Sequence, residues 1–324
     1  MTRAGHVALV GRPNVGKSTL LNALVGEKLS IVTPRAQTTR DAVTGILTTE
    51  RAQLIFVDTP GLLEPQYTLH RSMQQTALAA LLDADVVLLL LDATRSDELP
   101  TGEALAALQR QRHTLLAAVN KVDAAPAAAA ALESWCLAAL KVRPQRISAV
   151  TKEGLETLLT ALEAALPAAP FYYPPDELAI QPVRFFVAEL VRETVFEEYE
   201  DELPYATVVR VEEYREGSDP VYIRASVYVE RASQKAIVVG RGGAGIKRLG
   251  ARSRSKIEEF VGAPVYLDLW VKVLPGWRRK AETLRYLGYP VPQGGGGAGA
   301  APGRERRQRR GGSDGATGGG KPSD

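Results

Sequence analysis

The residues most able to do chemistry form a motif near the N-terminus, Gly11-Arg-Pro-Asn-Val-Gly-Lys-Ser18. An apolar run precedes it and a helical stretch follows, and in that context G-x-x-x-x-G-K-[ST] directs backbone N–H groups at a triphosphate. Lys17 would reach the β- and γ-phosphates, and Ser18 would bind Mg²⁺. A glycine-rich turn without a ligand is the alternative. The expected phosphate-loop contacts are Gly11, Arg12, Pro13, Asn14, Val15, Gly16, Lys17, Ser18 and Thr19.

A second motif, NKVD at residues 120–123, closes another apolar run that reads as a buried strand. Ligands bind at this edge of open α/β sheets. The Asp123 carboxylate can accept hydrogen bonds from N1–H and N2–H₂ of guanine, a pattern that adenine lacks, so the motif favours GTP and GDP over ATP. Asn120 would brace the loop beneath the base. The expected base contacts are Asn120, Lys121, Asp123 and the backbone amides of Ser148 and Ala149.

Two further segments offer oxygen ligands for Mg²⁺. Asp58 opens the run Asp-Thr-Pro-Gly at the end of an apolar strand, a position typical of a carboxylate that binds the metal through water. Thr38 and Thr39 lie in a polar loop, and either hydroxyl could bind the metal in the triphosphate state; we favour Thr39. The expected magnesium ligands are Ser18, Thr39 and Asp58, with Thr59, Pro60 and Gly61 as additional nucleotide contacts.

Hydrolysis of the nucleotide would rest on few groups, namely Lys17, Thr39 and the Gly61 amide, which can bind the γ-phosphate. Ras-like GTPases place a water-orienting glutamine directly after this glycine, where this chain has Leu62. Leucine cannot orient water, so we predict slow intrinsic hydrolysis, with the missing group supplied from elsewhere. Asn14 could help to hold K⁺ near the phosphates as a built-in charge.

The elements that must position these residues follow from apolar patterning. Short apolar runs alternate with helical stretches in the first half of the chain, which predicts a doubly wound, mostly parallel α/β sheet. Segments 42–48 and 52–58 are too close for a crossover and should pair as an antiparallel hairpin. The remaining strands are expected at 6–10, 86–91 and 115–119, and the helices at 17–25, 70–82, 101–111, 127–140 and 154–166.

The chain divides at a proline-rich stretch near residues 167–175, which favours a stiff, extended connection. We expect a nucleotide-binding domain at 1–168, a linker at 169–181 and a second, α+β domain at 182–290. Residues 291–324 are rich in glycine and arginine and contain no large apolar residue after Val291, so this tail should be disordered.

The second domain combines a helix after Pro182 with strands at 221–229 and 265–273, each alternating apolar and polar residues. The turn Gly240-Arg-Gly-Gly243 should join two helices and let an RNA backbone approach closely, as in KH domains. Ile237, Val238 and Val239 could line a groove for bases. The expected RNA contacts are Gly240, Arg241, Gly242, Gly243, Lys247, Arg248, Arg252, Trp277 and Arg278.

The charge pattern supports this interpretation. Segment 231–256 contains basic residues and no acidic one, whereas segment 189–202 is strongly acidic. We expect a basic face opposite an acidic one, with the basic face steering polyanions. A solvated basic face without function is the alternative, and Trp277 could equally well pack within the domain.

Composition excludes several classes of protein. The chain has 324 residues, 45% of them apolar and 24% charged, with a net charge of +3. The single cysteine excludes an internal disulfide framework and a cysteine-built metal cluster. No apolar run approaches the length of a membrane span, and the N-terminus does not resemble a signal peptide, so a cytoplasmic location is expected.

The motifs GRPNVGKST, AQTTR, DTPG and NKVD, followed by VERxSQK, VGRGG and YLDLWVKV, together resemble the Era family of bacterial GTPases over roughly residues 5–289. The resemblance implies a P-loop GTPase domain followed by a type II KH domain. It also implies a monomeric switch that binds the 3′ end of 16S ribosomal RNA on the 30S precursor, with possible peripheral attachment to the inner membrane. GTP would favour RNA binding and hydrolysis would favour release.

Two other interpretations stay open. An RNA-binding or RNA-chaperone protein could keep its first domain only as a nucleotide-insensitive scaffold, although the intact Lys17, Ser18, Asp58 and Asp123 argue against this. A GTPase that modifies transfer RNA would need a further catalytic domain, for which the chain leaves no room.

Overall fold

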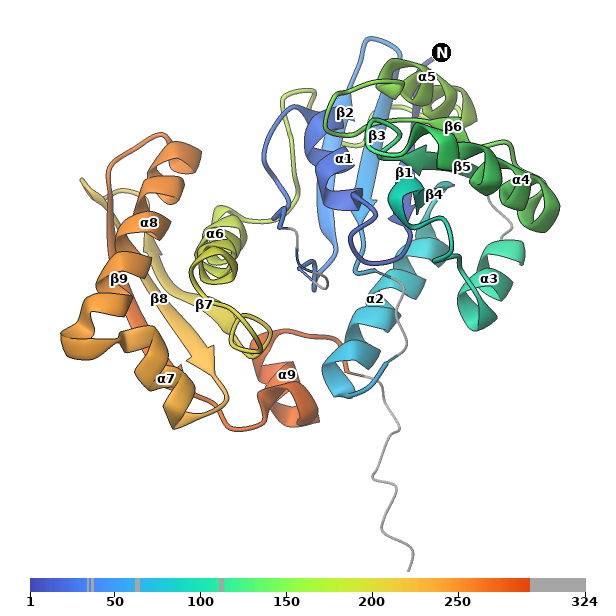
Figure 1. The fold of residues 1–324 in the computed structure, drawn as a ribbon. Helices are drawn as coiled ribbons and strands as arrows, with labels where there is room; N and C mark the ends of the chain where they lie inside the picture. Colours follow the sequence, from blue (N-terminus) through green and yellow to red (C-terminus); the bar gives the residue numbers. More distant parts are fainter. Residues whose placement is uncertain (34, 36–37, 62–64, 111–113, 292–324) are drawn as a thin grey trace, which may run out of the picture. The chain divides into compact units, whose positions relative to one another are not determined.

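A computed structural model describes residues 1–33, 35, 38–61, 65–110 and 114–291. Met1–Pro292 form one compact unit that contains two separate sheets. The expected divisions at residues 168 and 182 therefore stay a prediction, and the expectation of a disordered tail falls outside the described residues. Figure 1 shows the two sheets and the helices that flank them.

The first sheet has the order β2-β3-β1-β4-β5-β6. Its pairs are parallel except β2 with β3, which confirms the predicted hairpin. The strands are β1 (Arg3–Val10), β2 (Val43–Thr48), β3 (Ala52–Asp58), β4 (Val86–Asp92), β5 (Thr114–Asn120) and β6 (Gln145–Arg146). The helices between them are α1 (Lys17–Val25), α2 (Thr68–Asp83), α3 (Gly102–Gln109) and α4 (Ala129–Leu140), and α5 (Leu155–Ala165) follows β6.

The first sheet is buried on both faces, as its continuous apolar strands require. Along β1, Val7 and Leu9 pack into a core with α1 and α5, whereas Ala8 and Val10 pack into a second core with α3 and α4. These two layers fix the ends of β1, β3 and β5, from which the functional loops emerge.

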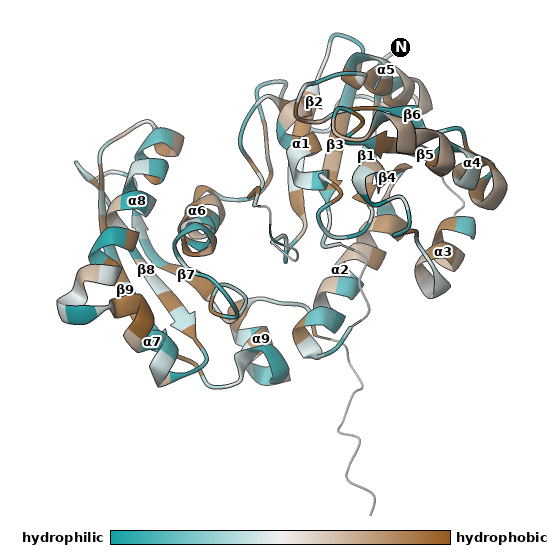
Figure 2. Cartoon of the chain, in the orientation of Figure 1, coloured by the Kyte–Doolittle hydropathy of each residue, from teal (hydrophilic) through white to brown (hydrophobic). Residues whose placement is uncertain are grey.

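The second sheet has three strands, β7 (Val208–Arg215), β8 (Val221–Val229) and β9 (Val265–Val273), with β7 antiparallel and β9 parallel to β8. Its helices are α6 (Val183–Glu198), α7 (Ala232–Val239), α8 (Ala244–Val261) and α9 (Ala281–Leu287). The apolar positions of β8 form a core with α6, α7 and α8. Figure 2 shows hydrophilic residues along α8, in agreement with the basic pattern of its sequence.

Two elements of this second part have no counterpart among the sequence expectations. Strand β7 contains an irregularity between Val211 and Glu213, which breaks the alternation of apolar and polar residues. Helix α9 is only seven residues long. Among the helices of the described ranges, none combines the length and the apolar character needed to span a bilayer.

Candidate nucleotide site and RNA interface

The phosphate loop ends where α1 begins, at Gly16, which has a φ of +96°. A Cβ atom at this position would lie 2.4 Å from Asn120 Nδ2, so the site requires glycine both for its backbone conformation and for its space. The following residue, Lys17, is buried, and its Nζ donates to the carbonyl oxygens of Gly11 at 3.3 Å and Arg12 at 3.1 Å. Burial lowers the pKa of Lys17 to about 8, and Asp58 opposes this shift.

Ser18, Thr39 and Asp58, the three expected magnesium ligands, converge. Ser18 Oγ donates to Asp58 Oδ2 at 2.7 Å and lies 3.0 Å from Thr39 Oγ1. Thr38 points elsewhere, with its hydroxyl 2.8 Å from both Thr33 Oγ1 and the Arg35 carbonyl oxygen. The geometry therefore places Thr39, the favoured threonine, in the oxygen cluster and Thr38 outside it.

The oxygen cluster also fits a hard divalent cation. Asp58 is fully buried, and its Oδ1 has no hydrogen-bond partner within the described ranges. Burial raises the pKa of Asp58, whereas Lys17 and the hydroxyls around it act against that rise. One of those hydroxyls belongs to Ser30, which donates to Asp58 Oδ2 at 3.0 Å. Ser30 was not predicted, because no local signal in the sequence marks it.

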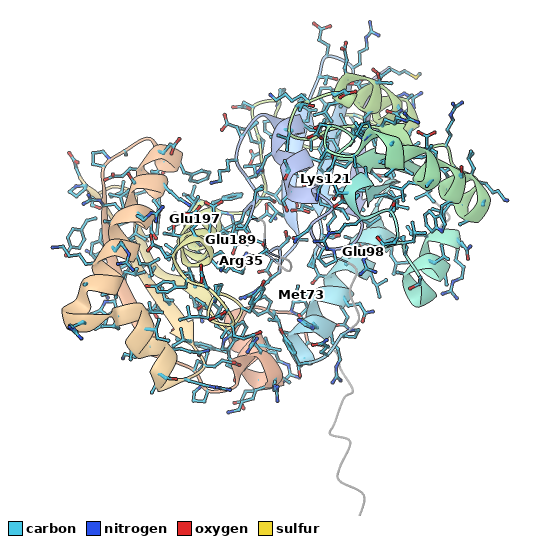
Figure 3. The ribbon with its side chains drawn as sticks, viewed as in Figure 1. Arg35, Met73, Glu98, Lys121, Glu189 and Glu197 are labelled. Atoms are coloured by element: carbon cyan, nitrogen blue, oxygen red, sulfur yellow. The ribbon has the colours of Figure 1, made fainter. Side chains whose placement is uncertain are left out.

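Asn120 and Lys121 brace the loops around the pocket, as predicted for Asn120. Asn120 Nδ2 donates to the Val15 carbonyl oxygen at 2.8 Å, and its Oδ1 accepts from the Ala149 amide at 2.9 Å. Lys121 Nζ contacts the Asn14 carbonyl oxygen and Asp92 Oδ2 at 2.7 and 2.6 Å. The labelled Lys121 is visible in Figure 3. Asp92 was missed, although an acid at the end of an apolar strand signals this edge.

Asp123, Ser148 and Ala149 are the other residues expected to contact the base. Asp123 is exposed at this end of the sheet. The Ser148 amide donates to the Glu153 carbonyl oxygen, and the Ala149 amide donates to Asn120. Both amides therefore already have acceptors, and their contact with a guanine oxygen stays a prediction.

The segment after β3 closes the other side of the pocket. A Cβ atom on Gly61 would lie 2.6 Å from the backbone nitrogen of Pro13, so this glycine permits a close approach to the phosphate loop. The Thr59 hydroxyl donates to the Leu9 carbonyl oxygen at 2.8 Å, which makes this side chain a structural tie between β3 and β1. Leu62, which takes the position of the water-orienting glutamine of Ras-like GTPases, lies outside the described residues. The resulting cavity, about 340 Å³, is lined by the phosphate loop and by residues 31–33, Thr38, Thr39, Gly61, Arg95 and Lys121.

The turn between α7 and α8 has the geometry expected of a nucleic-acid contact. Gly242 and Gly243 have positive φ values of 57° and 82°, and a Cβ atom on either would meet nothing within 4 Å. Arg241 and Lys247 flank them with exposed side chains. Backbone and charge are thus open to a phosphate chain. Ile237 is exposed next to this turn, but Val238 lies in the core, which corrects its expected place in a base-binding groove.

The expectation of a basic face opposite an acidic one is wrong. Helices α6 and α8 pack together, and their charges pair directly. Arg248 Nε donates to Glu198 at 2.7 Å and Arg252 also donates to Glu198, while Lys256 contacts Glu193 at 2.8 Å. Although burial raises the pKa of Glu198, the two arginines lower it below its usual value. Both arginines remain more than half exposed, so they can still face solvent.

Trp277 belongs to a buried cluster of the fold and not to an exposed surface. It is fully buried, donates from Nε1 to the Ala206 carbonyl oxygen at 2.8 Å and packs against Tyr289. Arg278 is also engaged, with its guanidinium 2.7 Å from Glu230 and over the ring of Tyr67. Of the two interpretations of Trp277, an RNA contact and packing within the domain, the structure supports packing.

A phosphate loop with a buried acidic and hydroxyl cluster, on a mostly parallel sheet, and a GxxG turn between two helices define a P-loop GTPase joined to a KH domain. Comparison with family models agrees. The model described as "50S ribosome-binding GTPase" matches residues 6–121, and the KH domain model matches residues 202–278.

The chain belongs to the Era family of GTPases. It is 42% identical over 301 residues to GTPase Era of Nitratidesulfovibrio vulgaris, covering 88% of this chain and 97% of that one. It is 41% identical to GTPase Era of Bradyrhizobium sp. strain ORS 278, covering 90% and 96%. A crystal structure of an alanine variant of Aquifex aeolicus Era bound to GDP·AlF₄⁻ matches with a TM-score of 0.83 and 35% identity, over 90% of this chain and all of the other.

A second solved structure bears on the KH domain. Era in complex with MgGDPNP and nucleotides 1506–1542 of 16S ribosomal RNA also matches with a TM-score of 0.83 and 35% identity. It covers 90% of this chain and 100% of that chain, so both domains are included in the likeness.

Proposed function

We propose that this GTPase is a switch that binds the 3′ end of 16S ribosomal RNA through its KH domain and acts in maturation of the 30S subunit. The observation that carries the proposal is the presence, within one compact unit, of the Ser18–Thr39–Asp58 cluster and an open GxxG turn. The RNA-bound Era structure, which resembles this chain over both domains, supports the choice of RNA.

At the nucleotide, each group has a separate task. Lys17 places an ammonium in the loop where phosphate oxygens bind, and Gly61 brings its amide against the loop for the γ-phosphate. Ser18 and Thr39 would hold Mg²⁺, with Asp58 acting through water, and the ion would neutralise phosphate charge when bound. Asp123 selects guanine. Because leucine follows Gly61 in the sequence, intrinsic hydrolysis is slow and the water-orienting group comes from elsewhere.

Potassium is the proposed source of additional positive charge. Asn14 lines the phosphate pocket, and its backbone lies in the left-handed region with a φ of 65°. We expect faster turnover in potassium than in sodium at equal ionic strength. Equal rates in the two buffers would remove the cation from the mechanism.

The experiment that tests the function is GTP hydrolysis with three samples: no RNA, a short RNA copying the 3′ end of 16S ribosomal RNA, and a scrambled RNA of the same composition. We expect stimulation by the matching RNA alone. Equal rates in all three, combined with RNA affinity that does not differ between GTP and GDP, would instead favour a nucleotide-insensitive RNA-binding protein.

The family resemblance supports further proposals on where the protein works. The protein would act in the cytoplasm as a monomer on 30S precursors, with peripheral contact to the inner membrane. Cosedimentation with 30S particles, sedimentation equilibrium and cell fractionation would test these three points separately.

A further inference from the structure

Arg40 belongs to the nucleotide-binding part of the chain, but its side chain is buried against the part that contains the second sheet. Arg40 is only 4% exposed. Its guanidinium donates to the carbonyl oxygens of Thr207 at 2.6 Å, Tyr205 at 2.9 Å and Pro204 at 3.3 Å. These residues lie between α6 and β7, and the contacts are internal to the compact unit Met1–Pro292.

The loop that accepts these hydrogen bonds, residues 203–207, also places an aromatic ring beside the guanidinium. Trp277 lies with its ring 5.5 Å from the Arg40 guanidinium carbon, a cation–π distance. The indole also donates to the Ala206 carbonyl oxygen, which fixes the loop from the other side. A planar fork of N–H donors suits several carbonyl oxygens at once, whereas an ammonium would satisfy fewer of them.

The neighbour of Arg40 in the sequence is Thr39, whose hydroxyl lies 3.0 Å from Ser18 Oγ. Adjacent Cα atoms are about 3.8 Å apart, so fixing the Arg40 backbone restricts where the Thr39 hydroxyl can go. Two other basic residues between α1 and β2 also contact this part of the chain: Lys28 contacts Glu193 of α6 at 2.8 Å, and Arg35 donates to the carbonyl oxygen of Tyr199, the residue after α6. Figure 3 labels Arg35 together with Glu189 and Glu197 of α6. Only Arg40 is adjacent to Thr39.

We propose that Arg40 is a positioning residue through which the loop 203–207 and Trp277 hold Thr39 at the magnesium site. This inference rests on the proposed function of Thr39 as a triphosphate-state ligand. The coupling is reciprocal by linkage: whatever displaces the loop 203–207 weakens the GTP-bound arrangement, and GTP with Mg²⁺ stabilises the loop. GDP, which does not need Thr39, is bound independently of Arg40.

The test compares Arg40→Ala and Arg40→Lys with wild type and with Lys28→Ala, which removes another cross-contact of the same segment. The affinities for GDP and for the non-hydrolysable analogue GDPNP are measured at a series of Mg²⁺ concentrations without RNA. Loss of Arg40 should weaken GDPNP binding at saturating Mg²⁺ about tenfold, the equivalent of one or two net hydrogen bonds, and leave GDP binding unchanged. Arg40→Lys should recover only part of the loss, and Lys28→Ala should match wild type.

A second readout separates positioning from simple loss of stability. In GDPNP with Mg²⁺, hydrogen exchange of the backbone at residues 38–41 should be faster in Arg40→Ala than in wild type. If Arg40→Ala does not fold, Trp277→Phe keeps a ring below the guanidinium, removes the bond to Ala206, and should show a smaller defect of the same kind. Equal weakening of GDP and GDPNP, or no weakening, would overturn the inference. Wild type that fails to bind GDPNP in a Mg²⁺-dependent manner would instead overturn the proposed function.

Discussion

The nucleotide site and the GxxG turn solve the binding of phosphate groups in opposite ways. Around the phosphate loop, the functional side chains already have fixed partners: Ser18 bonds Asp58, and Asn120 joins Val15 to Ala149. At the turn, Gly242 has open space in place of a side chain. The first region is organised in advance for one small ligand, whereas the second offers bare backbone and exposed charge to a long one. Substitutions should therefore act steeply at the first and gradually at the second.

The largest effect is expected for Lys17→Ala in the nucleotide site. The variant removes the one ammonium buried within the phosphate loop. Loss of such a preorganised electrostatic contact should lower GTP hydrolysis by about a thousandfold or more. Phosphate release measured with and without RNA provides the test. RNA affinity in the absence of nucleotide should stay at the wild-type level, and a parallel loss there would show that the two regions are not independent.

An intermediate effect is expected for Gly242→Asp at the turn. The carboxylate places an anion where the RNA backbone must approach, which should weaken RNA binding by roughly ten- to a hundredfold. The matched control is Gly242→Asn, which has nearly the same shape as the aspartate and a similar tolerance of a positive φ, but no charge. Binding titrations with the 16S RNA fragment check the result. Similar losses in both variants would assign the effect to backbone strain, and basal GTP hydrolysis should be unchanged in each.

The smallest effect, and a gain, is expected for Glu198→Gln. This carboxylate pairs with Arg248 and Arg252, so its removal frees two guanidinium groups for phosphate contacts. RNA affinity should rise a few-fold, with a steeper salt dependence by about one to two units of slope. Because the pKa of Glu198 lies below its usual 4.5, the pair stabilises the fold above that pH and is lost as the pH falls below it. Unchanged affinity and salt slope in the variant would show that these arginines do not contact RNA.

The sequence predicts the elements whose signals are local. Segments 17–25, 221–229 and 265–273 agree with α1, β8 and β9 in their bounds. Strand β7 was not predicted because its irregularity interrupts the period of two. Helix α9 was not predicted because seven residues are too few for a helical period to show.

At the sites, motifs identify residues but not their partners. Ser18, Thr39 and Asp58 come from three separate motifs, and the fold brings them together as expected. The acidic residues of α6 were expected on a separate face because their distance in sequence from α8 hides the packing of the two helices. Trp277 next to arginines resembles an RNA contact in sequence, but its burial depends on α9 and the loop before β7.

The brace formed by Asn120 bears on how the protein is made. The phosphate loop is complete once Ser18 has been synthesised, but Asn120 lies 105 residues beyond Val15, and its other partner, Ala149, lies a further 29 residues along. At translation rates of about 5–20 residues per second, Asn120 and Ala149 are synthesised on the order of ten seconds after the phosphate loop that they stabilise. A growing chain therefore acquires the nucleotide site late, after most of the first sheet, and cannot be held by GTP while that sheet is still being assembled.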